Sequence, residues 1–236
     1  MTDLTTWIGR SEVAEDTLDP GKLRLMEATL DRPPALAEGD ALPPLWHWLF
    51  FNSPVATQGL GPDGHAARGG FLPPVALPRR MWAGGRLKFD APLRIGAPAR
   101  RISTIEAVAE KTGRAGPLVF VTVRHEIEAG GHLTEWHDIV YRGPADGAPK
   151  REPAPNGTPV TRITPSLPLL FRYSALTFNT HRIHYDADYC RDVEGYPGPI
   201  VHGPLIATYL AGLAMSQLAR PLERFNFRAK QPLFVD

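Results

Sequence analysis

From residue 80 to residue 141, apolar and polar side chains alternate along the chain with a period of two. Val119, Val121 and Val123, for example, are each separated by a single residue, as expected for a strand with one buried face. Glycines at 113–116 and 130–131 mark turns between the alternating runs. The pattern predicts an antiparallel meander of four strands, at Trp82–Phe89, Leu93–Val108, Leu118–Glu128 and Leu133–Tyr141.

Outside this region, the spacing of apolar residues predicts three helices. Asp19 and Pro20 are typical of an N-cap and a first turn, and a helical pattern follows at 22–30. A short, very apolar helix is predicted at Pro44–Phe51, and a longer one at Pro204–Ala219. The other predicted elements are an extended segment at Leu169–Leu176, a helical turn at Ala187–Asp192, and strands beginning at Leu222–Phe227 and Pro232–Val235. These elements place the chain in the α+β class.

The chain is expected to consist of two units joined by a proline-rich segment. Residues 144–168 contain seven prolines, which disfavour a regular element, so this segment is interpreted as a linker. Residues 1–143 then form the first unit and residues 169–236 the second. The second unit has room for barely two strands, which predicts that its sheet is incomplete and that the sequence is truncated at the C-terminus. The alternative is a second unit that is smaller and unrelated to the first.

The composition argues against several classes of partner and of site. The net charge of +1 gives no overall field that would attract nucleic acid or an anionic membrane. Cys190 is the only cysteine, so an intrachain disulfide and a multi-cysteine metal site are excluded. No apolar run approaches the length of a membrane span, and residues 1–15 lack the pattern of a secretory signal. We therefore expect a cytoplasmic protein with no membrane partner.

Polar groups are concentrated between residues 179 and 186, and again just before the longer helix. The first segment holds Asn179, His181, His184 and Asp186, and a His-Gly pair follows at 202–203. Such a density of polar side chains beside an apolar helix predicts a site. Two histidines and a carboxylate are also a respectable set of metal ligands. Their spacing does not place all three on one face, however, so we expect no metal and no other cofactor.

Two stretches in the second half carry a resemblance to a known family. Leu-Thr-Phe-Asn-Thr-His-Arg-Ile-His-Tyr-Asp at 176–186 and Ile-Val-His-Gly at 200–203 resemble the MaoC-like hydratases and dehydratases of the hot-dog fold. The similarity is greater to their double hot-dog branch, which includes mesaconyl-C4-CoA hydratases and type-2 hydroxyacyl-thioester dehydratases. Residues 77–85 and 116–125 resemble the divergent first repeat of that branch.

This resemblance implies a double hot-dog fold. Each repeat would be an antiparallel sheet wrapped around a helix, with a complete site in the second repeat alone. Pro44–Phe51 would then be the helix of the degenerate first repeat.

The resemblance also implies roles for the residues of the motif. His184 falls on the family histidine, Asn179 on its aspartate and His181 on its asparagine. Because an amide cannot take a proton, Asn179 is expected to orient water or substrate, which leaves His184 as the leading general base. His181 would position His184 or share its role. The backbone N–H of Gly203, at the start of a helix, is the candidate donor to the thioester oxygen.

Arginines on either side of this site are candidates for substrate binding. Arg172 and Arg182 suit the phosphates of an acyl-CoA or a free carboxylate on its acyl group. Arg79 and Arg80 are interpreted as the start of a strand, with a CoA contact as the alternative. His202 is also expected to contact the substrate and to brace the loop that precedes the helix at Pro204–Ala219. Asp186 is expected to cap the following turn or to fix an imidazole, and not to act as an acid or base.

The leading hypothesis is a hydro-lyase that reversibly hydrates an α,β-unsaturated acyl thioester. Within that class, the resemblance favours a branched dicarboxyl acyl-CoA such as mesaconyl-C4-CoA. The carrier is CoA or an acyl carrier protein, and the protein is a homodimer or a pseudo-dimeric monomer. Two alternatives stay open, a hot-dog thioesterase and a non-catalytic acyl-CoA-binding subunit.

Overall fold

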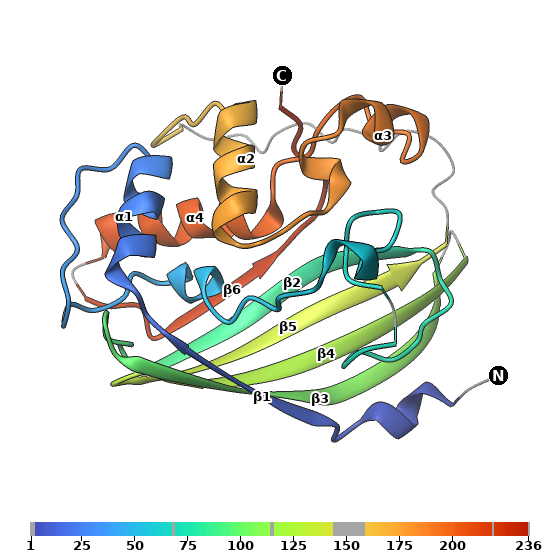
Figure 1. Cartoon of the computed structure of the whole chain (residues 1–236), viewed down its shortest axis with the longest axis horizontal. Coiled ribbons are helices and arrows are strands. Elements are labelled where there is room, and N and C mark those ends of the chain that lie inside the picture. The colour runs from blue at the N-terminus through green and yellow to red at the C-terminus, as the bar shows by residue number, and fades with distance from the viewer. Residues whose placement is uncertain (1–2, 68, 114–115, 144–158, 219, 236) are drawn as a thin grey trace.

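A six-stranded antiparallel sheet forms one side of the molecule (Figure 1). The structure is a computed structural model that describes residues 3–67, 69–113, 116–143, 159–218 and 220–235. The strands are β1 (Ser11–Thr17), β2 (Arg79–Ala91), β3 (Pro98–Gly113), β4 (Gly116–Glu128), β5 (His132–Arg142) and β6 (Arg224–Arg228). Their order in the sheet is β1-β3-β4-β5-β2-β6. The four predicted strands are present as β2 to β5, but only β3, β4 and β5 form the predicted antiparallel meander, because β2 pairs with β5 and not with β3.

The start of β3 and the presence of β1 also differ from the prediction. The strand expected from Leu93 begins at Pro98, because residues 93–97 form a turn in which Ala97 N–H donates to the carbonyl of Arg94. Strand β1 was not predicted, since its sequence is mostly acidic and polar and its Val13 is exposed. It forms through backbone pairing with β3 at the edge of the sheet, where charged side chains also discourage pairing with other molecules.

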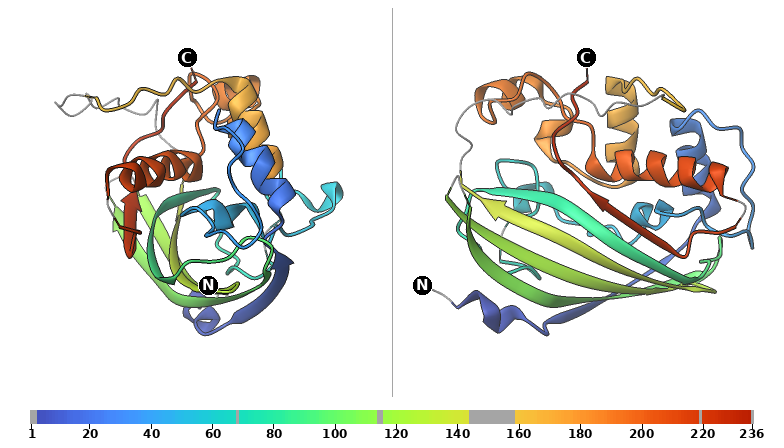
Figure 2. Two further views of the ribbon diagram at one scale, coloured as in Figure 1. Left: turned by 90° about the vertical axis from the view of Figure 1, so that its left-hand side faces the viewer. Right: turned by 180° about the vertical axis from the view of Figure 1, so that it is seen from behind.

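The helices cover the concave face of the sheet (Figures 1 and 2). The α-helices are α1 (Pro20–Thr29), α2 (Leu167–Leu176), α3 (Ala187–Asp192) and α4 (Gly203–Gln217). Short 3-10 helices occur at η1 (Leu4–Trp7), η2 (Trp46–Leu49), η3 (Thr57–Gly59) and η4 (Arg182–His184). Apolar residues from α1, η2, α2 and α4 form one core cluster with the inner face of the strands. Among the described helices, none combines the length and apolar character that a membrane span requires.

The segment predicted as extended at Leu169–Leu176 is helix α2, so that prediction was wrong. Ser166 caps the helix by accepting a hydrogen bond from Leu169 N–H at 3.3 Å, and Pro168 occupies the first turn. Leu170, Tyr173 and Leu176 then recur at helical spacing and are all buried. A short apolar run can be either a strand or a buried helix, and here the capping residues decide for the helix.

The helix predicted at Pro44–Phe51 is reduced to the single turn η2. Leu45 and Phe51 adopt φ angles of 71° and 59°, which an α-helix does not allow, and they bracket the turn. Trp46 and Leu49 are nevertheless buried, as their apolar character predicts. The sheet curves around this segment (Figure 2, left), so η2 occupies the place of a central helix.

The second half of the chain adds to the same sheet. Strand β6 pairs antiparallel with β2, with Leu87 opposite Phe225. The strand predicted at Pro232–Val235 is limited to one isolated bridge, between Phe234 and Ile200. Residues 144–158 of the predicted linker lie outside the described residues, and residues 159–166 form no helix or strand. The boundaries proposed for the two units stay predictions.

A buried polar contact joins η2 to the inner face of the sheet. Glu135, on the inner face of β5, has one carboxylate oxygen 2.9 Å from His47 Nε2. Its other oxygen accepts a hydrogen bond from Trp48 Nε1 at 2.9 Å. Because all three groups are paired, this contact fastens η2 to the sheet without leaving a buried charge unsatisfied.

Candidate active site

The segment with the highest density of polar residues connects α2 to α3. At the end of α2, Phe178 adopts a φ angle of 50°, which turns the chain sharply. Asn179 N–H then donates to the carbonyl of Ser174 at 2.8 Å. The next residues form η4, and the carboxylate of Asp186 caps α3 by accepting from Tyr189 N–H at 2.9 Å, as predicted. This compact path brings the motif histidines onto one short segment.

His184 is buried and held in one orientation. Its Nδ1 lies 2.7 Å from the carbonyl oxygen of Ile200. Because a carbonyl only accepts hydrogen bonds, Nδ1 carries the proton and Nε2 is left with a lone pair. Burial, as the largest cause, lowers the pKa of His184 to about 4, although the bond to Ile200 acts to raise it. His184 is therefore a neutral imidazole at neutral pH, with Nε2 able to accept a proton.

His202 packs directly against His184. The two rings are stacked, with centroids 3.7 Å apart and planes 16° from parallel. His202 is fully buried, and its Nε2 lies 2.8 Å from Ser174 Oγ. Its Nδ1 is buried without a hydrogen-bond partner among the described residues. The contact with Ser174 ties His202, and through the stacked rings His184, to helix α2. The predicted substrate-binding and bracing roles of His202 stay predictions.

Asn179 and His181 lie on the same short segment as His184. Asn179 Oδ1 accepts a hydrogen bond from His181 N–H at 3.0 Å. The amide nitrogen, the donor of this side chain, has no hydrogen-bond partner among the described residues. The His181 ring is perpendicular to that of His184, with centroids 5.5 Å apart. Burial, followed by the charges of His65 and His184, lowers the pKa of His181 to about 2. His181 is thus also neutral at neutral pH.

Gly203 begins helix α4, and no side chain caps this helix end. Within the described residues, the N–H of Gly203 has no hydrogen-bond partner. A Cβ built at this position would meet no atom within 4 Å. A free N–H at the positive end of a helix dipole, in open space, fits the predicted donor to a thioester oxygen.

A second acid and a third histidine approach the motif from the first half of the chain. Asp63 and His65 lie in the loop between η3 and β2, and the His65 ring is 3.9 Å from that of His181. Asp63 Oδ2 lies 3.0 Å from His65 Nδ1. Neither residue was identified as a site residue from the sequence. The signal present in the sequence was an acid and a histidine separated by one glycine, which is common in turns.

These residues form a possible metal site. Asp63, His65 and His181 each offer one ligand atom, and these atoms lie within 4.8 Å of one another. The trio considered from sequence does not gather in this way, since the Asp186 carboxylate is engaged by Arg182 at 2.8 Å. A metal on the observed trio would displace the proton shared by Asp63 and His65.

Three hydrogen bonds within the protein hold the Arg182 guanidinium. Its guanidinium bonds Asp186 at 3.0 and 2.8 Å, and the carbonyl of Pro62 at 3.1 Å. It also lies over the ring of Tyr189, at 4.1 Å from the centroid. These contacts fasten the loop at 61–65 to the motif. The predicted role of Arg182 in substrate binding stays a prediction.

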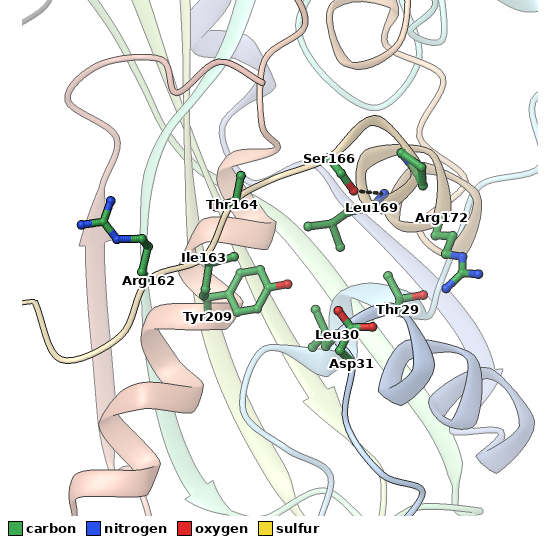
Figure 3. A pocket seen from close by; sticks show the side chains of 11 residues that line it. Thr29, Leu30, Asp31, Arg162, Ile163, Thr164, Ser166, Leu169, Arg172 and Tyr209 are labelled. Atoms are coloured by element: carbon green, nitrogen blue, oxygen red, sulfur yellow. Dashed lines mark hydrogen bonds between the residues drawn. The ribbon is translucent and has the colours of Figure 1, made fainter. Parts of the chain in front are cut away.

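Arg172 lies on the exposed face of α2 and lines a polar groove of about 450 Å³ (Figure 3). The groove runs between α2, the end of α1, the segment before α2, and α4. Arg162, Asp31 and Tyr209 also line it, whereas none of the four predicted catalytic residues does. Substrate binding by Arg172 stays a prediction as well, and this groove is where it would act.

Residues 45–235 match the family model for hydroxyacyl-thioester dehydratase type 2. The chain is 48% identical over 241 residues to mesaconyl-C(4)-CoA hydratase of Chloroflexus aurantiacus, covering 98% of this chain and 85% of that protein.

Two solved structures share the fold at low sequence identity. A MaoC-like dehydratase, 15% identical, superposes with a TM-score of 0.68, covering 99% of this chain and 86% of its own. A Mycobacterium tuberculosis protein described as having a double hotdog fold superposes with a TM-score of 0.56, at 14% identity, covering 96% of this chain and 80% of its own. The predicted double hot-dog fold is thereby confirmed. The chain belongs to the hydroxyacyl-thioester dehydratase type 2 family.

Proposed function

We propose that this protein reversibly adds water across the double bond of an α,β-unsaturated acyl-CoA, with His184 as the general base. The observation that carries the proposal is the orientation of His184. Its Nδ1 proton is committed to Ile200, so the lone pair at Nε2 is available to take a proton from water. Membership of a family of hydratases and dehydratases supports this class of reaction.

In the proposed reaction, water is held and activated while the thioester is polarised. The free amide donor of Asn179 orients the water oxygen, and His184 Nε2 removes a proton as that oxygen attacks the β-carbon. The electron pair of the double bond moves toward the thioester oxygen. Gly203 N–H stabilises the resulting enolate charge, since a preformed donor at a helix N-terminus needs little reorganisation. Protonation at the α-carbon completes the hydration.

Within this class, we propose a branched dicarboxyl substrate such as mesaconyl-C4-CoA. The 48% identity to a hydratase of that name supports this choice. Mesaconyl-C4-CoA carries a methyl group and a free carboxylate on its β-carbon, so a cation is required close to the general base.

Arg80, on β2, has the position and the charge for this carboxylate. It pairs with Tyr141 of β5, and Tyr141 is buried in the interior cluster. Directly opposed residues share a face of the sheet, so Arg80 points to the same interior side. Its guanidinium makes no hydrogen bond or ion pair with the described residues. The adjacent Arg79, in contrast, is paired with Glu194 at 3.2 Å.

The nearby charged groups leave Arg80 uncompensated. Its charge is among the causes that lower the pKa of His181 and of His137, after burial as the largest cause. Both histidines are therefore neutral, and the interior Glu135 is already paired with His47. An anionic acyl group would supply the missing partner.

We further propose CoA as the carrier and the groove at Arg172 as the place where its phosphates bind. Arg162 and Arg172 both line that groove, and arginine suits phosphate through paired hydrogen bonds. A homodimer or a pseudo-dimeric monomer remains our proposal for the assembly.

A panel of enoyl-CoAs tests the function. The purified protein is incubated with mesaconyl-C4-CoA, with crotonyl-CoA as the monocarboxylic comparison, and products are analysed by mass spectrometry for a gain of one water. We expect hydration of mesaconyl-C4-CoA to be the more efficient. Arg80→Gln should remove most of that preference, whereas Arg86→Gln, an exposed arginine on the same strand, should not. Release of free CoA thiol without hydration would instead identify a thioesterase.

A further inference from the structure

Helix α2 contacts both segments of the candidate site through one residue, Ser174. The carbonyl of Ser174 accepts a hydrogen bond from Asn179 N–H at 2.8 Å, and its hydroxyl oxygen lies 2.8 Å from His202 Nε2. Asn179 belongs to the segment between α2 and α3, whereas His202 directly precedes α4. Ser174 therefore lies where these two segments meet helix α2.

The hydroxyl of Ser174 is the hydrogen-bond partner of the His202 ring. His202 is fully buried, and its Nδ1 has no hydrogen-bond partner among the described residues. The contact between Nε2 and Ser174 is thus the hydrogen bond that this ring makes within the described part of the chain. Without the hydroxyl, both ring nitrogens would be buried and unpaired, which favours movement of the ring or entry of water.

The His202 ring in turn covers the general base. It is stacked on the ring of His184, with centroids 3.7 Å apart and planes 16° from parallel. Ile200, two residues before His202, accepts from His184 Nδ1 at 2.7 Å and donates its N–H to the carbonyl of Ile183 at 2.8 Å. Because the base is held by the segment that carries His202, a movement of His202 would change the orientation and the hydration of the base.

We propose that Ser174 is a positioning residue that holds His202 against His184 and so keeps the general base fixed relative to Asn179. This inference rests on the proposed function, since it concerns the base and the water-orienting amide of the hydration. Ser174 exchanges no proton with the substrate in this role. Its hydroxyl acts on the base through His202, and its carbonyl anchors the backbone of Asn179.

The groups around His184 make the pH profile a test of this role. The His202 ring is stacked on it, the His181 ring is perpendicular to it, and His65 acts on it by charge. Burial, as the largest cause, lowers the pKa of His184 from 6.5 to about 4. Water that enters when the Ser174 hydroxyl is lost would reduce this effect and raise the pKa of His184. Because the base must be neutral, activity would then be lost at a higher pH than in the wild type.

The chain offers a matched control in Ser103, on β3. Its hydroxyl oxygen lies 2.9 Å from Nδ1 of His125, its partner on β4. Ser103 is buried, so this is also an interior hydrogen bond between a serine and a histidine. It is formed within the sheet and involves none of the residues assigned to the reaction. Ser103→Ala therefore removes the same kind of bond away from the base.

The variants are Ser174→Ala, Ser174→Thr, Ser174→Cys and Ser103→Ala. Each is assayed for kcat, KM and the pH profile of hydration with mesaconyl-C4-CoA, and circular dichroism at each pH establishes that it is folded. Threonine keeps the hydroxyl, whereas the thiol of cysteine is only a weak donor and acceptor. Titration of the His184 ring by NMR, in the free proteins, measures its pKa without substrate.

We expect Ser174→Ala to lower kcat by about 10–10²-fold, the scale on which a displacement of about 1 Å reduces a rate, with a much smaller change in KM. Its activity should be lost at a higher pH than that of the wild type as the pH falls, and the pKa of His184 should rise. Ser174→Thr should restore kcat and the pH profile, and Ser174→Cys should be intermediate. Ser103→Ala should keep both at wild-type values.

The outcomes separate this inference from the proposed function. If the wild type hydrates none of the enoyl-CoAs, the proposed function fails, and an unchanged pKa of His184 in Ser174→Ala would show that Ser174 does not control the ring. If the wild type hydrates them and Ser174→Ala keeps its kcat and pH profile, the role of Ser174 alone is wrong. Equal losses of kcat in Ser174→Ala and Ser103→Ala would likewise overturn it. If Ser174→Ala does not fold, wild-type values in Ser174→Cys would do so.

Discussion

The imidazole rings of His184 and His202 are stacked 3.7 Å apart, and both are buried. Two positive charges at that separation would repel strongly, and no acid among the described residues acts on the pKa of either ring. The pair is stable only while both rings are neutral, which agrees with pKa values lowered to about 4 and about 2, mainly by burial.

We expect the free energy of unfolding to fall as the pH drops below about 6.5. The folded-state pKa values of His184, His202, His181 and His125 are lowered, so between the unfolded and folded values the unfolded chain binds more protons. The stabilisation is therefore fully present above the unfolded-state pKa. Below that pKa, each such histidine lowers the free energy of unfolding by about 1.4 kcal/mol per pH unit. Urea unfolding between about pH 7.5 and about pH 5.5 measures the slope, a window that spans the unfolded pKa of histidine. His125→Gln should reduce it by one proton, and an unchanged slope would contradict the assignment.

His184→Ala should abolish measurable hydration. Removal of a general base costs about 10²–10⁴-fold in rate, and the proposed site has no second group oriented to take the proton from water. The measurement is formation of the hydrated thioester by mass spectrometry, with folding followed by circular dichroism. His132→Ala, which removes an exposed histidine, is the control. Normal turnover by a folded His184→Ala protein would rule out the proposed mechanism.

Gly64→Ala should reduce both stability and activity, because its Cβ would press against the carbonyl of Thr180. Gly9→Ala is the matched control: Gly9 has a φ angle of 87°, against 86° for Gly64, but its Cβ would meet nothing within 4 Å. Gly9→Ala should therefore cost about 1 kcal/mol of unfolding free energy from backbone strain alone. Chemical unfolding and kcat/KM distinguish the two, and equal effects would argue against a tight docking of the loop.

Glu135→Gln should destabilise the protein by about 1–3 kcal/mol, the cost of an unsatisfied buried polar group. The substituted amide can still accept from Trp48, but its NH2 group would face His47. Glu106→Gln is the surface counterpart, since Glu106 also accepts from an indole, that of Trp136, at 2.9 Å and is exposed. It should be nearly neutral. Comparable losses in the two variants, by urea unfolding, would mean that burial of Glu135 is unimportant.

The alternation and the helical spacing of apolar residues predicted the strands and helices that bury one face. Strands β2 to β5 alternate because one face is buried, and α4 is apolar because it lies against the core. Strand β1 escaped prediction because it is formed by backbone pairing at an edge, which leaves no apolar signature. Helix α2 was misassigned because an apolar run of that length is compatible with either structure.

The residues of the candidate site also differ in whether the sequence alone could identify them. Asn179, His181 and His184 could be identified because they lie within six residues of one another. Asp63 and His65 could not, because nothing in a glycine-rich loop shows which distant segment it will contact. Arg80 was interpreted as a strand start. Its position on the interior face of β2, without an ion-pair partner among the described residues, could be recognised only from the structure.

The pairing of β6 with β2 affects how the protein folds. Strand β2 ends at residue 91 and β6 begins at residue 224, so this pairing closes a loop of more than half the chain. Closing a long loop costs entropy before any contact is gained, and contacts of such separation are associated with slow folding. Because β6 joins a sheet built by the first half, and one apolar cluster draws residues from both halves, the two halves share a core. We therefore expect the chain to unfold in one cooperative transition.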